Sequence, residues 1–499
     1  MRIIIYFGID IGTSNCKCTA FNADGSQVAE SSKEYVKVPG QMGLDPERLF
    51  SDVCEVIGEC AKQIEKTGDK NKISSITVSS FGESFTALDK NGHTISDIIV
   101  YSDNWGRNEV EILRKKIPNI AQIAGAKPNS FYALPKMTHI LKTRPDIEKN
   151  LWKFLQVADY IIYRLCGETV IDYSLACRAL TFDVLNQSWS EEILSAAGIS
   201  SDKLSTPVPA GSIAGVIHKN LAEILNLPEN TKIVVGVHDQ VASATGAGTL
   251  REGEAVVGTG SVECITPVFG SPILEPDFLE RNFACIPHVV PGKYVTYAFA
   301  LTGGSMLSWF RDRIVPHLRP IAEEKNCSVY DLLNESCPDE PSDLLVVPHF
   351  GGSGTPELDP LALGTVTGFS MTTGLPEIYR AILEGLCFEL RYNRDQLDLF
   401  DISFSSLRAT GGGTRSDIWL QLKADILNIP VSPLSNSNAG TTGSAMLAAV
   451  AAGEFKSLDK AAEVFVKVRE PFLPNDKITG YYDEKYEKYK KIRQISTIR

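Results

Sequence analysis

The sequence is poor in several features that would assign it to a common functional class. It has no apolar run that approaches the roughly 18 residues of a membrane span. Its short apolar start, MRIIIYFGID, is not followed by a small-residue cleavage segment and is typical of a buried strand rather than a signal peptide. It also has no long segment of low complexity. We therefore expect a globular protein that has no membrane partner.

Basic residues and paired cysteines are also scarce. Lys and Arg total 49 against 61 Asp and Glu, which gives a formal net charge of −12. Nucleic-acid-binding proteins usually carry a basic patch, so we expect no nucleic-acid partner. The 11 cysteines are scattered without a CxxC pair, which disfavours a zinc site or a disulfide framework. Reduced thiols are typical of a cytoplasmic protein, and this is the location we predict.

The N-terminal segment resembles a nucleotide-binding turn but lacks the usual motifs. Neither the P-loop GxxxxGK[ST] nor the dinucleotide fingerprint GxGxxG occurs in IIIYFGIDIGTSNCKCTAFNADG, residues 3–25. Residues 15–20 instead alternate between polar and apolar side chains, which is the period of a strand. Asp24 and Gly25 then form a hairpin signal. The segment therefore predicts a strand, a tight turn, a second strand and another turn.

The tight turn carries groups that suit a phosphate ligand. Backbone N–H groups at Gly12 can bind phosphate without a helix, Thr13 and Ser14 add hydroxyls, and Lys17 adds a positive charge. Asp10, at the end of the first strand, could hold Mg²⁺ through water molecules. The alternative is an ordinary hairpin in which Asp10 accepts hydrogen bonds from the amides of its own turn.

A second copy of this pattern occurs downstream, in EAVVGTGSVECITPV, residues 254–268. An apolar run again reaches a turn, here at Gly258 and Thr259, and alternation follows. Two such units suggest two related domains that offer hairpins to the same phosphates. Between them a strand at 233–237 ends at His238-Asp239, and small residues at 242–248 predict a close-packed helix at the junction of the halves. Two lobes with a cleft suit a phosphotransferase, which must exclude water.

These segments together resemble the FGGY family of carbohydrate kinases, which has the actin- and hexokinase-like fold. The ordered set that carries the resemblance is FGIDIGTS, DYIIYRLCGETVIDYSLACRALTFD, GVHDQVA, GTGS, LTGGS and GGGTRSDIWLQLKADILNIPV. The resemblance implies an α/β protein of two ribonuclease H-like domains with a cleft between them. Residues 1–247 would bind the sugar and supply the catalytic base, and residues 248–499 would bind most of the nucleotide. ATP and Mg²⁺ would be the cofactors, and the substrate would be a small sugar, ketose or polyol.

Asp239 is the predicted catalytic base and a contact of the substrate. A carboxylate at a strand end that faces the cleft can orient a hydroxyl and accept its proton, and the resemblance points to the same residue. The alternative is a helix N-cap for the small-residue helix that follows. Because adjacent strand residues point to opposite faces, we predict a structural role for His238.

Glycine-rich segments in the second half are predicted to bind the nucleotide. Gly303 and Gly304 in LTGGS indicate a close backbone approach, and GGGTRSDIW precedes a helix at 418–427. The resemblance places adenosine at this second segment, where Arg415 would stack on adenine or remain a solvated loop charge. The predicted nucleotide and phosphate contacts are Gly12, Thr13, Ser14, Lys17, Gly258, Thr259, Gly303, Gly304, Gly411, Gly412, Gly413, Arg415 and Ser416.

The predicted sugar contacts follow two strand ends in the first half. Glu83, beside Ser84, can bridge two neighbouring hydroxyls. Asp103 and Arg107 resemble the family's acid-and-arginine pair, although Asp103 is also a candidate helix cap.

Other positions around the sugar site leave its specificity open. Lys136 matches a family lysine. His139 stands where many members have tryptophan, and Phe-Gly-Glu-Ser (81–84) stands where many ketopentose kinases have Gln-Met-His-Gly. Both departures leave the identity of the sugar open.

Two other functions fit the same sequence. An actin- or chaperone-like ATPase of this fold would need no sugar substrate and no acid at Asp239. A non-catalytic binding protein would not need both Asp10 and Asp239. The C-terminal segment 483–499 is predicted to be a solvated helix without a partner signal, and the sequence leaves a homodimer open.

Overall fold

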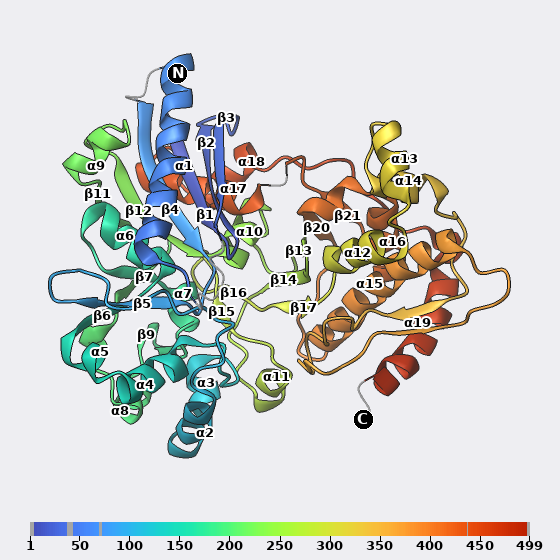
Figure 1. Cartoon of the computed structure of the whole chain (residues 1–499), viewed down its shortest axis with the longest axis horizontal. Helices are drawn as coiled ribbons and strands as arrows, with labels where there is room; N and C mark the ends of the chain where they lie inside the picture. Colours follow the sequence, from blue (N-terminus) through green and yellow to red (C-terminus); the bar gives the residue numbers. More distant parts are fainter. Residues whose placement is uncertain (1–3, 37–42, 69–71, 437, 497–499) are drawn as a thin grey trace.

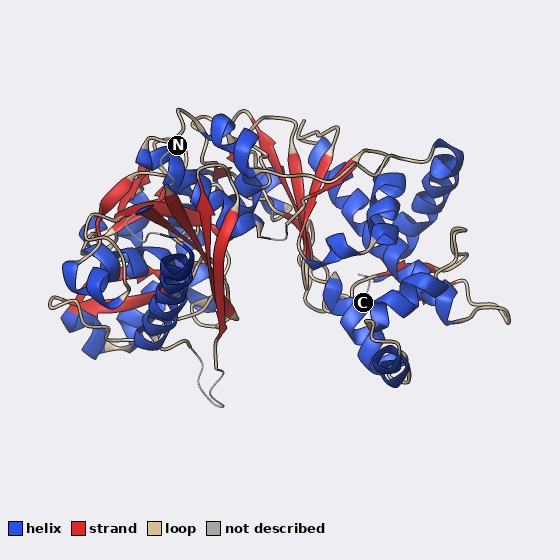
Figure 2. Cartoon of the chain, turned by 90° about the horizontal axis from the view of Figure 1, so that it is seen from above, coloured by secondary structure: helices blue, strands red, loops and turns tan. Residues whose placement is uncertain are grey.

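The computed structural model describes residues 4–36, 43–68, 72–436 and 438–496, and these form two lobes that lie side by side (Figure 1). Figure 2 shows the lobes from above, joined along one side where the second large sheet lies. Among the described residues, no helix combines the length and the apolar character needed to cross a membrane.

The N-terminal lobe is built on a six-stranded sheet with the order β11-β12-β4-β1-β2-β3. The strands are β1 (Ile5–Ile11), β2 (Asn15–Asn22), β3 (Gln27–Glu34), β4 (Ile73–Ser80), β11 (Ile213–Val216) and β12 (Lys232–His238). β1, β2 and β3 form an antiparallel meander, whereas β4 and β12 continue the sheet in parallel. The predicted succession of strand, turn, strand and turn is confirmed.

A second sheet repeats this arrangement. Its order is β15-β16-β14-β13-β20-β21, and β17 also pairs with β14. The strands are β13 (Ala255–Thr259), β14 (Glu263–Phe269), β15 (Ile286–Pro287), β16 (Tyr294–Val295), β17 (Ala298–Ala300), β20 (Leu407–Thr410) and β21 (Val431–Pro433). The series β17-β14-β13 is antiparallel and β20 and β21 are parallel, which matches β3-β2-β1 followed by β4 and β12. The duplication that the two Gly-Thr turns predict is confirmed.

Helices cover both sheets and form the outer part of the C-terminal lobe (Figure 1). Short strands β5 (Phe85–Asp89), β6 (Leu151–Gln156) and β7 (Val170–Asp172) extend the N-terminal lobe. The principal helices are α1 (Pro46–Thr67), α2 (Arg107–Lys116), α4 (Ala133–Thr143), α6 (Val157–Cys166), α7 (Tyr173–Cys177), α10 (Asp239–Gly246), α12 (Gly304–Trp309), α15 (Leu375–Asp398), α16 (Asp417–Leu427), α17 (Ala439–Ala452) and α19 (Asp476–Ser496).

Helices α10 and α17 cross at the junction of the two lobes. α10 follows β12, and α17 follows β21, so each leaves the fifth strand of its own duplicated unit. A Cβ atom at Gly246 would lie 1.9 Å from Ala439 O, and one at Gly443 would lie 2.1 Å from Ala242 O. The small residues are therefore required for the backbones to meet, as the sequence at 242–248 predicts.

Helix α17 also packs on β1, although it lies far downstream in the chain. A Cβ atom at Gly8 would lie 1.9 Å from Thr441 O. The last part of the second half is therefore in direct backbone contact with the first sheet.

The C-terminal helix corrects one prediction. Tyr482, Tyr486 and Tyr489 of α19 are buried, and Arg493 Nε donates to Glu389 Oε2 of α15 at 3.0 Å. The prediction of a solvated helix was wrong for the described part, up to residue 496, because a tyrosine face at helical spacing lies between the lysines and packs on the core.

Candidate active site

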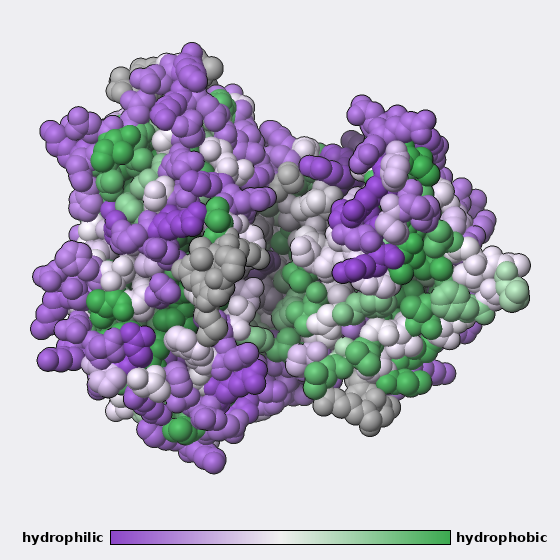
Figure 3. All heavy atoms as spheres, in the orientation of Figure 1, coloured by the Kyte–Doolittle hydropathy of each residue, from purple (hydrophilic) through white to green (hydrophobic). Residues whose placement is uncertain are grey.

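A cavity of about 830 Å³ lies between the lobes, at the ends of β1, β4 and β12. In the space-filling view a groove separates the lobes, and hydrophobic side chains gather on the C-terminal lobe beside it (Figure 3). The cavity is lined by residues 12–15, 81–83, Tyr101, Asn104, Arg107, 129–131, Arg178, 238–240, Phe299, Leu301, Leu358 and Pro360.

A second cavity of about 360 Å³ adjoins the first, and Asn15 and Gln240 line both. It brings together the two hairpins that the sequence singles out. Asp10 and Lys17 come from the first hairpin, and Gly258 and Thr259 come from the second. Gly411, Asn438 and residues 439–441 complete the wall near the start of α17.

Asp10 lies in the wall of this second cavity. Ser79 Oγ donates a hydrogen bond to Asp10 Oδ1 at 3.2 Å. Lys17 is the cross-strand partner of Asp10, but its Nζ donates to Asn438 Oδ1 at 3.0 Å. Loss of hydration raises the pKa of Asp10 to about 6. A Cβ atom at Gly440 would lie 2.8 Å from Asp10 Oδ2, so glycine there leaves room for the carboxylate.

Asp239 opens α10 at the floor of the larger cavity. Its side chain is 28% exposed, and its Oδ1 accepts no hydrogen bond from the part of the chain that the structure describes. Burial, followed by repulsion from Asp10 and Glu83, raises the pKa of Asp239 to about 8. A carboxyl group with a pKa near neutrality is suited to exchange a proton with a hydroxyl.

His238 lies against Asp239, which corrects a second prediction. His238 Nε2 is 3.4 Å from Asp239 Oδ1, whereas the sequence predicted that the two side chains point to opposite faces. Strand alternation does not reach this pair because β12 ends at His238 and α10 begins at Asp239.

Glu83 is held in the larger cavity by Arg178. Arg178 Nε donates to Glu83 Oε1 at 2.5 Å, and Nη2 donates to the same oxygen. The guanidinium also lies over the rings of Tyr132 and Tyr297, at 5.0 and 5.6 Å from the centroids. No described residue donates a hydrogen bond to Glu83 Oε2, so this oxygen remains available to a ligand.

The other predicted sugar contacts divide into two groups. Arg107 lines the cavity and donates to Asn104 Oδ1 at 2.6 Å. Ser84 and Asp103 do not line it. Ser84 Oγ accepts a hydrogen bond from Tyr101 N at 3.0 Å, and Asp103 accepts one from Val100 N at 3.2 Å. These two residues fix the loop that presents Tyr101 and Arg107.

Lys136 holds the backbone of two residues that line the larger cavity, Tyr101 and Phe131. Its buried Nζ donates to Tyr101 O at 3.0 Å and to Phe131 O at 2.8 Å, and burial lowers its pKa to about 8. His139, one turn further along α4, lies 3.5 Å from Glu109 and does not line the cavity.

Several predicted nucleotide contacts lie outside both cavities. Gly304 N donates to Gly260 O at 2.8 Å, and a Cβ atom at Gly413 would lie 2.1 Å from Thr259 Cγ2. These glycines therefore let the backbone pack around the second turn. The residues outside the two cavities are Gly303, Gly304, Gly412, Gly413, the exposed Arg415, and Ser416, which caps α16.

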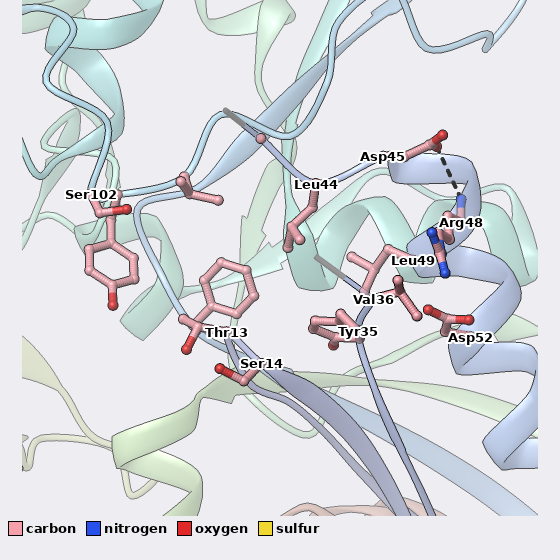
Figure 4. Close-up of a pocket in the computed structure, with 14 residues that line it drawn as sticks. Thr13, Ser14, Tyr35, Val36, Leu44, Asp45, Arg48, Leu49, Asp52 and Ser102 are labelled. Carbon is pink, nitrogen blue, oxygen red and sulfur yellow. Dashed lines mark hydrogen bonds between the residues drawn. The ribbon is translucent and has the colours of Figure 1, made fainter. Parts of the chain in front are cut away.

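Thr13 and Ser14 stand between the larger cavity and a side pocket of about 330 Å³. Figure 4 shows both residues along one side of this pocket, between Ser102 and the pair Arg48 and Asp52. The first turn therefore exposes its hydroxyls on two sides, whereas Lys17 lies on the side of the second cavity.

Sequence reasoning missed Arg178, Gln240 and Asn438. Arg178 belongs to a segment that carried the family resemblance, but nothing in its local pattern pairs it with Glu83, 95 residues away. Asn438 precedes a helix that starts with small residues, as Asp239 does, and this repetition was the signal that could have located it.

The duplicated sheet with crossing helices is the ribonuclease H-like fold of the actin and hexokinase class, as predicted. Residues 5–246 match the N-terminal domain, and residues 253–452 match the C-terminal domain, of the FGGY family of carbohydrate kinases. The chain belongs to this family. It is therefore a phosphotransferase that acts on an alcohol group of a carbohydrate.

Proteins similar to this chain include kinases named for different substrates. Xylulose kinase of Bacillus subtilis (strain 168) is 28% identical over 503 residues, which cover 99% of this chain and 97% of the relative. Gluconokinase of Bacillus licheniformis is 28% identical over 92% of this chain and 89% of the relative. The structure of gluconate kinase from Lactobacillus acidophilus matches the fold with a TM-score of 0.88 and 23% identity, over 99% of both chains.

Proposed function

We propose that this kinase uses MgATP to phosphorylate one hydroxyl of a small ketose or polyol, with Asp239 as the general base. The observation that carries the proposal is the placement of the partly exposed Asp239 carboxyl group in the larger cavity, next to the cavity that joins both Gly-Thr turns. Family membership favours this function over an actin- or chaperone-like ATPase that lacks a sugar substrate.

Asp239 and Glu83 present carboxylate oxygens to the acceptor. A hydroxyl that donates a hydrogen bond to the exposed part of the Asp239 carboxylate is oriented for attack and gives its proton to that carboxylate as the phosphoryl group is transferred. Glu83 Oε2 accepts from another hydroxyl, while Arg178 keeps the carboxylate in place. The carboxyl groups of Asp239 and Glu83 therefore favour a substrate rich in hydroxyl donors.

The second cavity would hold the phosphate groups. Lys17 supplies positive charge and the turn at Gly258 and Thr259 supplies backbone donors, while Thr13 lines the adjoining larger cavity. The N-terminus of α17, which is 14 residues long, also faces this cavity, and helix N-termini favour anions. Residues 411–416 would then lie on the adenosine side, as the family resemblance implies.

Asp10 fits the role of a magnesium contact. Mg²⁺ in such enzymes is usually held by one or two carboxylates together with the nucleotide phosphates. Asp10 is the carboxylate in the phosphate-side cavity, and its raised pKa reflects a poorly hydrated charge that a cation would compensate. When bound, the ion would neutralise charge on the transferring phosphoryl group.

The test is ADP release with MgATP across a panel of ketopentoses, ketohexoses, tetritols, pentitols, glycerol and gluconate. We expect strong stimulation by one ketose or polyol and little by gluconate. A response to gluconate alone would contradict the substrate class. Uniform silence with continued ATP hydrolysis would instead support an ATPase that uses no sugar.

A further inference from the structure

We propose that His238 is a positioning residue for the base, and that Tyr297 fixes the orientation and tautomer of its ring from the C-terminal half of the chain. This inference rests on the proposed role of Asp239. It assigns a function to two residues that the mechanism above does not use.

The three side chains form a continuous series. The Tyr297 hydroxyl lies 2.7 Å from His238 Nδ1, and the two rings stack with centroids 5.3 Å apart and an interplanar angle of 25°. The other ring nitrogen, Nε2, lies 3.4 Å from Asp239 Oδ1. Both His238 and Tyr297 are buried, at 6% and 9% exposure.

The hydrogen-bonding inventory decides which nitrogen of His238 carries the proton. Burial and the nearby Arg178 guanidinium hold the pKa of His238 well below its usual range, so the ring is neutral and has one N–H. Within the described structure, the Tyr297 hydroxyl has no acceptor other than Nδ1. A buried hydroxyl without an acceptor is costly, so Tyr297 donates to Nδ1 and the N–H of His238 is on Nε2, toward Asp239.

Packing prevents the ring from turning away. Ser174 Oγ accepts a hydrogen bond from His238 N at 3.0 Å, which fixes the backbone at the end of β12. On another side, a Cβ atom at Gly82 would lie 2.9 Å from His238 Cδ2, so the ring fits closely against the Gly82 backbone. The 3.4 Å separation from Asp239 shortens into a hydrogen bond with only a small movement of the carboxylate.

The contacts that run from Tyr297 through His238 to Asp239 join the two halves of the chain at the proposed general base. His238 and Asp239 belong to β12 and α10 of the first unit, whereas Tyr297 precedes β17 of the second sheet. Tyr297 also contacts Arg178, which holds Glu83. One tyrosine therefore touches both the residue that orients the base and the residue that orients the sugar contact.

Loss of the Nε2–H donor of His238 is expected to change the proton affinity of Asp239. A hydrogen bond to a carboxylate favours the ionised form, so its loss raises the pKa of Asp239 and moves the acid limb of the rate profile to higher pH. Tyr297 itself stays protonated, because burial raises its pKa well above the usual range. The titratable groups that face this pair from the surrounding elements are Asp10, Glu83, Tyr101, Arg178 and Cys264.

The first experiment reads the tautomer without turnover. ¹⁵N-histidine spectra of the intact protein at neutral pH, assigned by difference with a His238→Gln variant, give the protonated nitrogen directly. We expect an Nε2–H tautomer that changes in Tyr297→Phe but not in Tyr294→Phe, a buried tyrosine of the same sheet. An Nδ1–H tautomer in the parent protein would overturn the inference.

The second experiment measures kcat, KM and the pH profile of kcat/KM by ADP release, with D-xylulose tested first and the best acceptor of the panel used thereafter. His238→Leu is expected to lower kcat about tenfold with little change in KM and to shift the acid limb to higher pH. His238→Gln, whose amide nitrogen reaches the place of Nε2, is expected to restore most of both. Equal defects in the Leu and Gln variants without a pH shift would show a merely structural role.

Asp239→Asn distinguishes a failure of the proposed base from a failure of the positioning role of His238. If this variant keeps full activity, the proposed base is wrong and the inference falls with it. If it is inactive while His238→Leu matches the parent protein, only the positioning role is wrong.

Discussion

The two Gly-Thr hairpins are the same backbone unit with different chemistry. Asp10 and Gly258 both occupy the last-but-one position of their strands, β1 and β13. Asp10 pairs across the strands with Lys17, whereas Gly258 pairs with Cys264. A Cβ atom at Gly258 would meet nothing within 4 Å. The first hairpin therefore supplies charge to the shared cavity, and the second supplies space.

The support beneath each turn differs in the same way. The neutral hydroxyl of Ser79 donates a hydrogen bond to Asp10, which leaves the negative charge of Asp10 available to a cation. Thr259 instead donates to Glu263 Oε1 at 3.2 Å, and Lys423 Nζ lies 3.0 Å from the same oxygen with both side chains buried. The ion pair under the second turn is internal to the fold, so its charges are not offered to a ligand.

The largest effect is expected from substitution of Asp239, which lies in the same half of the chain as Asp10. Asp239→Asn removes the proposed proton acceptor and should lower kcat by at least about 10²-fold, the usual contribution of acid–base catalysis. ATP binding, measured by calorimetry, should stay close to that of the parent protein because Asp239 does not line the second cavity, where we propose that the phosphates bind. Full turnover in this variant would refute the assignment of the base.

The buried pair under the second turn predicts a loss of stability. Lys423→Met leaves Glu263 as an uncompensated buried charge, which should lower the free energy of unfolding by about 3–5 kcal/mol. Lys423→Met combined with Glu263→Gln removes both charges and should recover a large part of this loss. Denaturant unfolding of both variants checks the expectation. If the single variant is as stable as the parent, the pair does not hold the second turn.

How far the sequence predicts this molecule depends on the range of the interaction. The first hairpin, the strand before Asp239 and the helix at 418–427 were predicted because alternation, turn residues and helical spacing are local. The pair of Arg178 and Glu83 was missed because the chain fold alone brings it together. The closeness of His238 and Asp239 was misjudged because the strand ends between them. Helix α19 was misjudged because its many lysines concealed a tyrosine face.

The titration of Asp239 predicts a pH dependence of intermediate size. With a pKa of about 8, the carboxyl group is mostly protonated below pH 8 and cannot accept a proton; above pH 8 it is mostly ionised. We expect kcat/KM to rise about fivefold from pH 7 to pH 8 and to level off above pH 9. A rate that is constant from pH 6 to pH 9 would show that the base titrates elsewhere. Measurement of ADP release at saturating Mg²⁺ keeps the metal from limiting the profile.

The smallest effect tests the idea that the second hairpin supplies space. Gly258→Ala adds one methyl group toward the phosphate-side cavity without meeting protein atoms, so stability should change by less than about 1 kcal/mol while KM for ATP rises about threefold. Gly443→Ala is the matched control, because its methyl group would lie 2.1 Å from Ala242 O where α10 and α17 cross. That variant should lose stability instead. An unchanged KM in Gly258→Ala would mean that the opening at this glycine does not receive the nucleotide. The two hairpins would then differ in charge and space without any consequence of the second for nucleotide binding.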